Sequence, residues 1–383
     1  MIEIFVVINS TSYDNRVGEL LALPQLSEKG LVVEYWNVGR FTLKEDVRLC
    51  QVPKGVIYKE FDSVADLQKE ITKHDLEKTI FNTYFRYSKD TYCVFRLLTR
   101  LNCQYFFCAG GCLPSHRVNR SFSINAICDY KRVWNYIQNR IYQFIKITPL
   151  IKPATLYFKT CENATPNEGT VVDENTLYFN CNSSDWETGV RAGNVEIDYK
   201  YIVFVDQNIP FHPDSSINGY SFPEETYFKE LNKFFSAIEE KYSYPIIISA
   251  HPTSKKYESH DYFSGRRIIY NKTKDLIKNS EMVIVHFSTA MGFAVMYKKP
   301  LIFLNSSVFS KYRQFETICE DYSKVLGAQY VDTTTNIDSV SPSVNTKLYD
   351  LYKYTYLTNK DTESIPNCDV FYEVFRKFNI SKR

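Results

Sequence analysis

The sequence predicts an α/β protein of two consecutive domains, each built around a mostly parallel sheet. Short β-branched or aromatic runs alternate with amphipathic stretches at helical spacing, which is the pattern of strands joined by crossover helices. The alternation lapses between residues 164 and 194 and then restarts, so a domain boundary is expected near residues 185–198. The 383 residues suffice for two domains with complete cores.

The first domain, residues 1–190, opens with a strand, a helix and a second strand. The β-branched run at 4–8 predicts the first strand, and the apolar run at 31–36 predicts the second. Between them lies a helical pattern at 16–23 that Pro24 is expected to end. The alternation continues with strands expected at 55–58, 79–85 and 104–108, and with helices expected at 63–74 and 92–101.

The second domain, residues 195–350, repeats the pattern around a longer helix. An apolar strand at 201–205 precedes a helix at 223–242, whose aromatic and aliphatic residues recur along one stripe, as in a helix packed on a sheet. Ligands of open α/β sheets bind outside the carboxyl ends of the strands, so we expect a site there, in a cleft between two sheets. Further strands are expected at 245–250, 281–287 and 301–304.

The charge balance excludes several classes of protein. The chain has 46 Lys and Arg against 44 Asp and Glu, a net charge of +2 and 44% hydrophobic residues. This composition argues against intrinsic disorder, and neither the charge nor any recognisable module supports nucleic-acid binding. The uncharged run at 282–297 is shorter than the roughly 20 residues that span a bilayer, and the first residues lack the features of a signal peptide. We therefore expect a cytoplasmic protein.

The ten cysteines are spread along the chain and are expected to be free thiols. Only Cys103, Cys108 and Cys112 cluster, and His116 is the one nearby histidine that could complete a tetrahedral set. Their spacing fits neither a zinc ribbon nor a redox pair. We interpret them as ordinary half-buried thiols and predict no metal site.

Polar residues directly follow two predicted strands of the second domain. Asp206 comes after the strand at 201–205, where partial burial would raise the pKa of its carboxyl toward the range of a general base. The alternative is an Asp that caps the following turn. His251 and Pro252 follow the next strand, and Pro252 restricts the backbone so that the imidazole has a defined direction. With Lys255 nearby, His251 is a candidate phosphate contact.

A third polar group, Ser288 and Thr289, follows the strand at 281–287. Either residue is a candidate N-cap of a short helix that runs to about Tyr297, and hydroxyls beside unpaired helix N–H groups form an anion site. A helix cap without a ligand is the alternative. The strands that end at His251 and Ser288 are expected to be neighbours in one sheet.

In order, spacing and placement, these groups resemble the three motifs of bacterial glycosyltransferases with the GT-B fold. The matching residues are Asp206, the His251-Pro252 pair, and the Ser288-Thr289 pair with its downstream Lys299-Pro300. The resemblance is more particularly to enzymes that use CMP-activated nonulosonic acids, namely sialyl-, pseudaminyl-, legionaminyl- and Kdo-transferases. It covers roughly residues 195–310, a little under a third of the chain.

The resemblance implies an architecture and a set of roles. Two Rossmann-like domains would face each other across a cleft, and the tail at 351–383 would cross back to the first domain. Asp206 would deprotonate an acceptor hydroxyl, and His251 would stabilise the departing phosphate. Ser288 and Thr289 would hold phosphate or sugar carboxylate oxygens. The implied nucleotide- and phosphate-binding set is His251, Pro252, Lys255, Ser288 and Thr289.

The implied activity is inverting transfer of a sialic acid-like or Kdo-like sugar to a hydroxyl of a bacterial surface glycan, such as a capsule polysaccharide or lipooligosaccharide. The departing CMP carries a phosphate whose charge an imidazolium and a helix N-terminus can meet without a divalent ion. No Asp-x-Asp motif of metal-dependent transferases follows a predicted strand. The resemblance therefore implies metal independence and no cofactor beyond the CMP-linked donor.

The first motif departs from the family pattern. Gln207 and Asn208 stand where sialyltransferases of this type usually have a second acidic residue and a Gly, so Asp214 and Asp185 are fallback bases. Three alternatives remain open. They are a transferase with a UDP-, GDP- or CDP-linked donor, a sugar-nucleotide epimerase of the same architecture, and a carbohydrate-binding or assembly subunit that has lost catalysis.

The segment 131–152 interleaves basic and aromatic residues at helical spacing. Such a pattern suits adhesion to an anionic membrane surface, which would hold the enzyme at the inner face of the plasma membrane near a lipid-linked acceptor. A packed surface helix near the acceptor cleft is the interpretation we favour.

Overall fold

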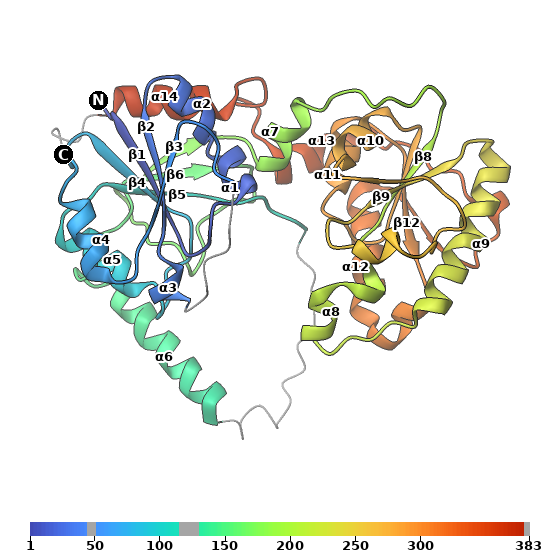
Figure 1. Cartoon of the computed structure of the whole chain (residues 1–383), viewed down its shortest axis with the longest axis horizontal. Coiled ribbons are helices and arrows are strands. Elements are labelled where there is room, and N and C mark those ends of the chain that lie inside the picture. The colour runs from blue at the N-terminus through green and yellow to red at the C-terminus, as the bar shows by residue number, and fades with distance from the viewer. Residues whose placement is uncertain (44–50, 115–129, 379–383) are drawn as a thin grey trace. The chain divides into compact units, whose positions relative to one another are not determined.

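The computed structural model describes residues 1–43, 51–114 and 130–378, which divide into two compact units (Figure 1). Of the described residues, unit 1 comprises 1–43, 51–112, 130–187 and 358–378, and unit 2 comprises 113–114 and 188–357. The chain passes into unit 2 after Glu187 and returns to unit 1 at Thr358. Residues 351–357, which the sequence assigned to the tail, belong to unit 2.

Unit 1 is built on a seven-stranded parallel sheet in the order β3-β2-β1-β4-β5-β6-β7. All five strands expected from the sequence are present, and two short ones, β6 and β7, extend the sheet beyond them. The strands are β1 Ile4–Asn9, β2 Val32–Asn37, β3 Val56–Glu60, β4 Thr79–Thr83, β5 Tyr105–Cys108, β6 Leu156–Lys159 and β7 Leu177–Asn180.

Helices cover both faces of this sheet, because its strands carry apolar side chains on both sides. One face packs against α1, α2 and α14, and the other against α4, α5 and α6. The returning tail contributes Phe371 and Phe375, and the Phe371 ring centroid lies 4.5 Å from that of Phe158. The helices are α1 Asn15–Leu20, α2 Leu23–Glu28, α3 Gly39–Thr42, α4 Val64–Ile71, α5 Tyr92–Arg100, α6 Tyr130–Lys146, α7 Ser184–Val190 and α14 Asn367–Lys377.

Pro24 does not end the first helix as the sequence predicted. Helix α1 stops at Leu20, Ala22 adopts a left-handed backbone with φ 51°, and Pro24 lies in the first turn of α2. Proline is tolerated there because the N–H groups of the first turn have no partner within the helix. The expected single helix is therefore two short ones.

Unit 2 is built on a six-stranded parallel sheet in the order β10-β9-β8-β11-β12-β13. Its strands are β8 Ile202–Val205, β9 Ile246–Ala250, β10 Ile268–Tyr270, β11 Met282–Val285, β12 Leu301–Asn305 and β13 Gln329–Asp332. Its helices are α8 Pro213–Ile217, α9 Glu224–Tyr242, α10 Thr273–Asn279, α11 Met291–Met296, α12 Arg313–Leu326 and α13 Thr346–Tyr352. Two parallel α/β units confirm the predicted fold class.

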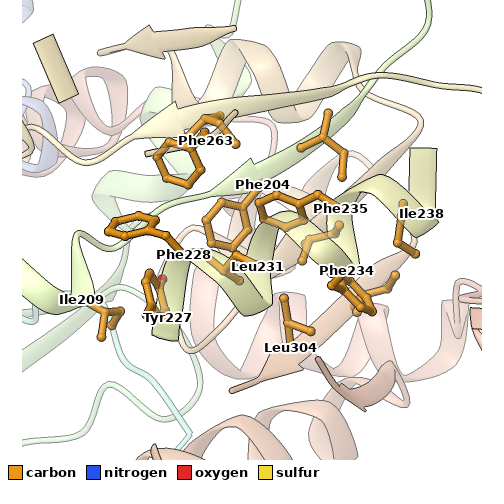
Figure 2. Packing of buried hydrophobic residues seen from close by; sticks show 14 of the residues in the cluster. Phe204, Ile209, Tyr227, Phe228, Leu231, Phe234, Phe235, Ile238, Phe263 and Leu304 are labelled. Carbon is orange, nitrogen blue, oxygen red and sulfur yellow. The ribbon is translucent and has the colours of Figure 1, made fainter. Parts of the chain in front are cut away.

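The expected apolar stripe of the long helix is confirmed. Phe228, Leu231, Phe235 and Ile238 of α9 are buried against the sheet, and the ring centroids of Phe204 and Phe235 are 5.0 Å apart (Figure 2). This aromatic packing fixes one face of β8, whose last residue precedes the candidate site.

The expected pairing of the strands that precede His251 and Ser288 is wrong. Strand β8 lies between β9 and β11, with Val205 opposite Ser249 and Phe204 opposite Ile284. Because all three strands are parallel, their carboxyl ends still meet at one edge of the sheet. The loops after β9 and β11 therefore flank the loop after β8.

A buried carboxylate in unit 1 is held by three donors. Glu34 on β2 is 5% exposed and accepts hydrogen bonds from Lys59 Nζ at 2.6 Å, Trp36 Nε1 at 2.7 Å and His74 Nε2 at 3.2 Å. Burial alone raises the pKa of Glu34, but the bonds from His74, Lys59 and Trp36 outweigh it and lower the pKa to about 2. The same carboxylate raises the pKa of His74.

We expect Glu34→Gln to lower the free energy of unfolding by about 3 kcal/mol, because it leaves buried donors without their charged partner. The raised pKa of His74 contributes stability that is complete below the unfolded value and is lost as the pH rises through the folded value. That loss should be smaller in the variant. Urea unfolding at several pH values measures both effects.

The matched control is Glu3→Gln, which removes an exposed ion pair with Lys78 at 2.9 Å. It should change the free energy of unfolding by less than about 0.5 kcal/mol. Equal losses in the two variants would contradict the role given to the buried network.

Candidate functional site

A cavity of about 380 Å³ in unit 2 lies where β8, β9 and β11 end. Its volume is within the roughly 300–1,000 Å³ range of small-molecule sites. One part of the wall is aromatic and is formed by Tyr220, Phe222, Phe287 and Phe315. The polar part consists of Gln207, His212, Asp214, Ser215, Asn218, His251, Ser288 and Thr289.

The cavity brings together four of the residues that the sequence singled out, which are His251, Ser288, Thr289 and the fallback base Asp214. The side chains of Asp206, Pro252 and Lys255 are not among its lining residues. Asp185 lies on α7 in unit 1, where burial raises the pKa of its carboxyl.

The predicted cap at Ser288 or Thr289 is wrong. Helix α11 covers only Met291–Met296, and its N-cap is Ala290, whose N–H donates to Ser288 Oγ at 3.2 Å. The two residues form the turn before this short helix. Ser288 and Thr289 therefore contribute their hydroxyls to the cavity, but they do not form the predicted anion site at a helix N-terminus.

Asp206 is buried beneath the loops of the site. It is 3% exposed, and its Oδ2 accepts from Tyr257 Oη at 3.1 Å and from the His251 N–H at 3.5 Å. Burial raises the pKa of Asp206 to about 6, although hydrogen bonds from the backbone of Asn208 and from Tyr257 oppose the shift. In this arrangement the carboxylate anchors the segment that begins at His251.

His251 is fixed through its Nδ1 atom. The backbone N–H of Thr253 donates to Nδ1 at 3.3 Å, and Thr253 Oγ1 lies 2.8 Å from the same atom. A backbone N–H can only donate, so Nδ1 is the acceptor and the proton of the neutral ring is on Nε2. The free donor of His251 is therefore Nε2–H.

His212 repeats this local geometry. The N–H of Asp214 donates to His212 Nδ1 at 3.2 Å, so His212 also keeps its Nε2–H as the free donor. Both histidines precede a proline, and in both the Nδ1 atom accepts from the residue two positions later. The two rings line the same cavity with centroids 5.0 Å apart.

Sequence reasoning missed His212 as a site residue and considered only Asp214 beside it. The available signal was the second His-Pro pair, since 212–213 and 251–252 are both His-Pro. His251 was predicted as a site residue because it directly follows a predicted strand. His212 instead follows the short 3₁₀ turn Ile209–Phe211.

Gln207 and Asn208, the two departures from the family motif, tie the site loops to β8. Gln207 Oε1 accepts from the Phe287 N–H at 3.0 Å, which connects the loop after β8 with the loop after β11. Asn208 Nδ2 donates to Thr253 Oγ1 at 3.1 Å, which leaves the Thr253 hydroxyl proton for His251 Nδ1. These amides therefore position the groups on both sides of β8.

The environment keeps His251 neutral at neutral pH. Burial lowers the pKa of His251 and the nearby His212 lowers it further, while Asp214 opposes the shift. Two close imidazoles resist a second positive charge unless an anion is bound between them.

The cysteine cluster does not form one site. Cys103 is fully buried, Cys108 Sγ lies 3.9 Å from Cys181 Sγ, and a hydrogen bond from Cys161 lowers the pKa of Cys112 to about 7. His116 lies outside the described residues. Within the described ranges, no three His, Cys, Asp or Glu side chains are grouped as ligands of a metal ion.

Comparisons with known proteins give the fold and no family. Neither a family model nor a curated protein matches the sequence. The UDP-GlcNAc 2-epimerase from Methanocaldococcus jannaschii superimposes with a TM-score of 0.50 at 14% identity, over 97% of this chain and 99% of that one. The wall teichoic acid polymerase TagF gives a TM-score of 0.52 at 10% identity, over 98% and 89%. These similarities confirm the expected GT-B fold.

We expect the neutral rings of His212 and His251 to be Nε2–H tautomers. The buried His286 is an internal control, because its Nδ1 donates to the Leu304 carbonyl at 2.5 Å and burial lowers its pKa to about 4. Long-range ¹H–¹⁵N spectra of histidine-labelled protein near pH 8 distinguish the tautomers. His212→Asn and His251→Asn assign the signals, and an Nδ1–H form of His251 would contradict the described site.

Proposed function

We propose that the chain is a glycosyltransferase that binds a nucleotide-sugar donor in the cavity of unit 2. The observation that carries this proposal is the pair of imidazoles, which offers two Nε2–H donors in one cavity with rings 5.0 Å apart. Two donors at this spacing suit the oxygens of one phosphate or diphosphate. The hydroxyls of Ser288 and Thr289 add further donors on the loop after β11.

The same cavity offers a place for a nucleobase. Tyr220, Phe222, Phe287 and Phe315 provide an aromatic surface beside the polar wall. An aromatic face can stack on a base, and donors in the other wall can meet the phosphate. The structural likeness to a UDP-GlcNAc 2-epimerase and to the wall teichoic acid polymerase TagF supports a nucleotide-sugar ligand.

Proton uptake should accompany binding. An anion beside His251 raises the pKa of its imidazole above that in the free protein, where burial lowers it. Affinity for the phosphate should therefore increase as the pH falls from about 8 to about 6. The charged imidazole also stabilises the negative charge on the departing phosphate.

We assign the role of general base to Asp214 in place of Asp206. Asp214 is exposed and lines the cavity, whereas Asp206 is buried and bonded to Tyr257. A base must reach the proton of an acceptor hydroxyl, and an exposed carboxylate can do so without opening the loops.

The finer proposal is a CMP-linked nonulosonic acid donor and a hydroxyl acceptor on a bacterial surface glycan. It rests on the motif resemblance, with Asp214 in place of the expected base. The second candidate is epimerisation of a UDP-linked sugar, which the structural likeness to UDP-GlcNAc 2-epimerase favours. Incubation of a donor without acceptor separates the two, because an epimerase turns over and a transferase at most hydrolyses the donor slowly.

Cytidine nucleotides should raise the melting temperature more than uridine or guanosine nucleotides do. The measurement is a thermal-shift panel of CMP, CDP, UDP and GDP, with dissociation constants from calorimetry. His212→Ala and His251→Ala should each weaken binding roughly 10-fold to 100-fold, because each removes a hydrogen bond to a charged group. A response to UDP alone would redirect the donor assignment, and no response to any nucleotide would refute the proposal.

Asp214→Asn should reduce sugar transfer by roughly 100-fold or more and leave nucleotide affinity within about threefold, because a general base acts on the acceptor. Initial rates with a CMP-sugar and a glycan acceptor measure the first effect, and calorimetry measures the second. Asp206→Asn is the comparison and should act through folding and through His251. Normal transfer by Asp214→Asn would return the base role to another residue.

A further inference from the structure

Helix α6 of unit 1 exposes an apolar stripe that the proposed function does not use. Trp134, Ile137, Ile141 and Phe144 follow one another at helical spacing and are 42–67% exposed. These positions lie within roughly a quarter of the circumference of an α-helix. Ile147 and Leu150, just beyond the helix, are also exposed. Such a contiguous apolar face marks an interaction site.

The side of α6 that adjoins the stripe holds the helix on unit 1. Tyr142 and Ile145 pack against the core below α4 and α5, and the ring of Tyr142 lies 5.3 Å from that of Tyr92. Lys146 Nζ donates to the carbonyls of Glu168 and Thr170 at 3.0 and 3.2 Å. The C-terminal half is therefore anchored, and the N-terminal turns extend beyond the other helices of unit 1 (Figure 1).

The segment that carries the stripe has charge of one sign, although Glu168 of a later loop lies near Arg140. In a chain of nearly balanced charge, residues 130–161 contain no Asp or Glu. The basic residues of that segment are Lys131, Arg132, Arg140, Lys146, Lys152 and Lys159. Arg140 is exposed on α6, and its Nε donates to Tyr136 Oη at 3.1 Å. Lys89 also lies beside the helix, bonded to Gln138 at 3.1 Å.

We propose that α6 docks unit 1 on an anionic lipid surface, with Trp134, Ile137, Ile141 and Phe144 inserted among the headgroups and acyl chains. A helix with bulky apolar residues on one face and basic residues beside them is the pattern of interfacial binding. Each basic residue near an anionic leaflet adds to the attraction. A second copy of the chain is a poorer occupant, since a symmetric contact would bring two basic helices together.

This proposal does not depend on the nucleotide site, so the test uses full-length protein without nucleotide. Vesicles of phosphatidylcholine mixed with phosphatidylglycerol should sediment the protein and shift the emission of Trp134 to shorter wavelength. Vesicles of phosphatidylcholine alone should sediment less protein and should shift the emission less. Binding to the anionic vesicles should weaken at high salt. Trp134→Phe should still bind without the spectral shift, which assigns the signal to Trp134, since Trp36 and Trp186 remain in the variant.

The variant Ile141→Glu with Phe144→Glu should lower partition to anionic vesicles about tenfold or more. The matched control is Leu351→Glu, which places a carboxylate on an equally exposed apolar position of α13 in unit 2 and should bind like the wild type. Since all three side chains are exposed, both variants should melt at the wild-type temperature.

Three results would overturn the proposal. Equal partition to neutral and anionic vesicles would show that α6 does not select an anionic lipid surface. Absence of binding to either kind of vesicle would remove the membrane altogether. A dimer in solution that the double substitution dissociates, without vesicle binding, would assign the stripe to a second copy of the chain.

Discussion

The candidate site depends on the parallel pairing of β8 with both of its neighbours. Parallel strands place all their carboxyl ends at one edge, and β8 lies in register with β9 and β11. The loops that carry His251 and Ser288 are thereby held on either side of the loop after β8. Gln207 and Asn208 then connect that loop to both neighbours through single hydrogen bonds. Without this pairing the four predicted cavity residues would not come together in one cavity.

Much of the framework was predictable because it depends on local patterns. The runs at 201–205 and 245–250 are almost entirely apolar, as is typical of strands covered on both faces, and both are strands in the structure. The stripe of α9 follows the 3.6-residue period and is buried as expected. Short strands such as β6 and β7, with four residues each, give too little pattern to recognise.

The rest depended on contacts between distant residues. Strand order is set by pairing across the sheet, so the sequence did not reveal that β8 separates β9 from β11. The partnership of His212 with His251 spans 39 positions and depends on two loops that meet in space. The assignment of Asp206 as a base followed from its place after a strand, yet the same place buries it under Tyr257. Position along the chain predicted proximity to the site but not the direction of the side chain.

Burial alone does not decide the charge of these groups, and the comparison of Glu34 with Asp206 shows why. Both carboxylates are nearly inaccessible, yet the pKa of Glu34 falls to about 2 and that of Asp206 rises to about 6. Glu34 receives bonds from a lysine and a protonatable histidine, whereas Asp206 has only a phenol and backbone N–H groups. The cationic partners make the difference, because a neutral donor offsets less of the cost of desolvation.

Helix α6 shows a limit of sequence patterns of a different kind. The alternation of basic and aromatic residues at 131–152 fits both a packed helix, the interpretation favoured from the sequence, and a membrane-bound helix, because both need one apolar face. In the structure the helix has two adjoining apolar surfaces, one that packs through Tyr142 and Ile145 and one that stays exposed through Trp134 and Phe144. A helix that only packs on its domain needs the first surface alone. The second surface, in a segment without acidic residues, is the part of the pattern that packing leaves unexplained.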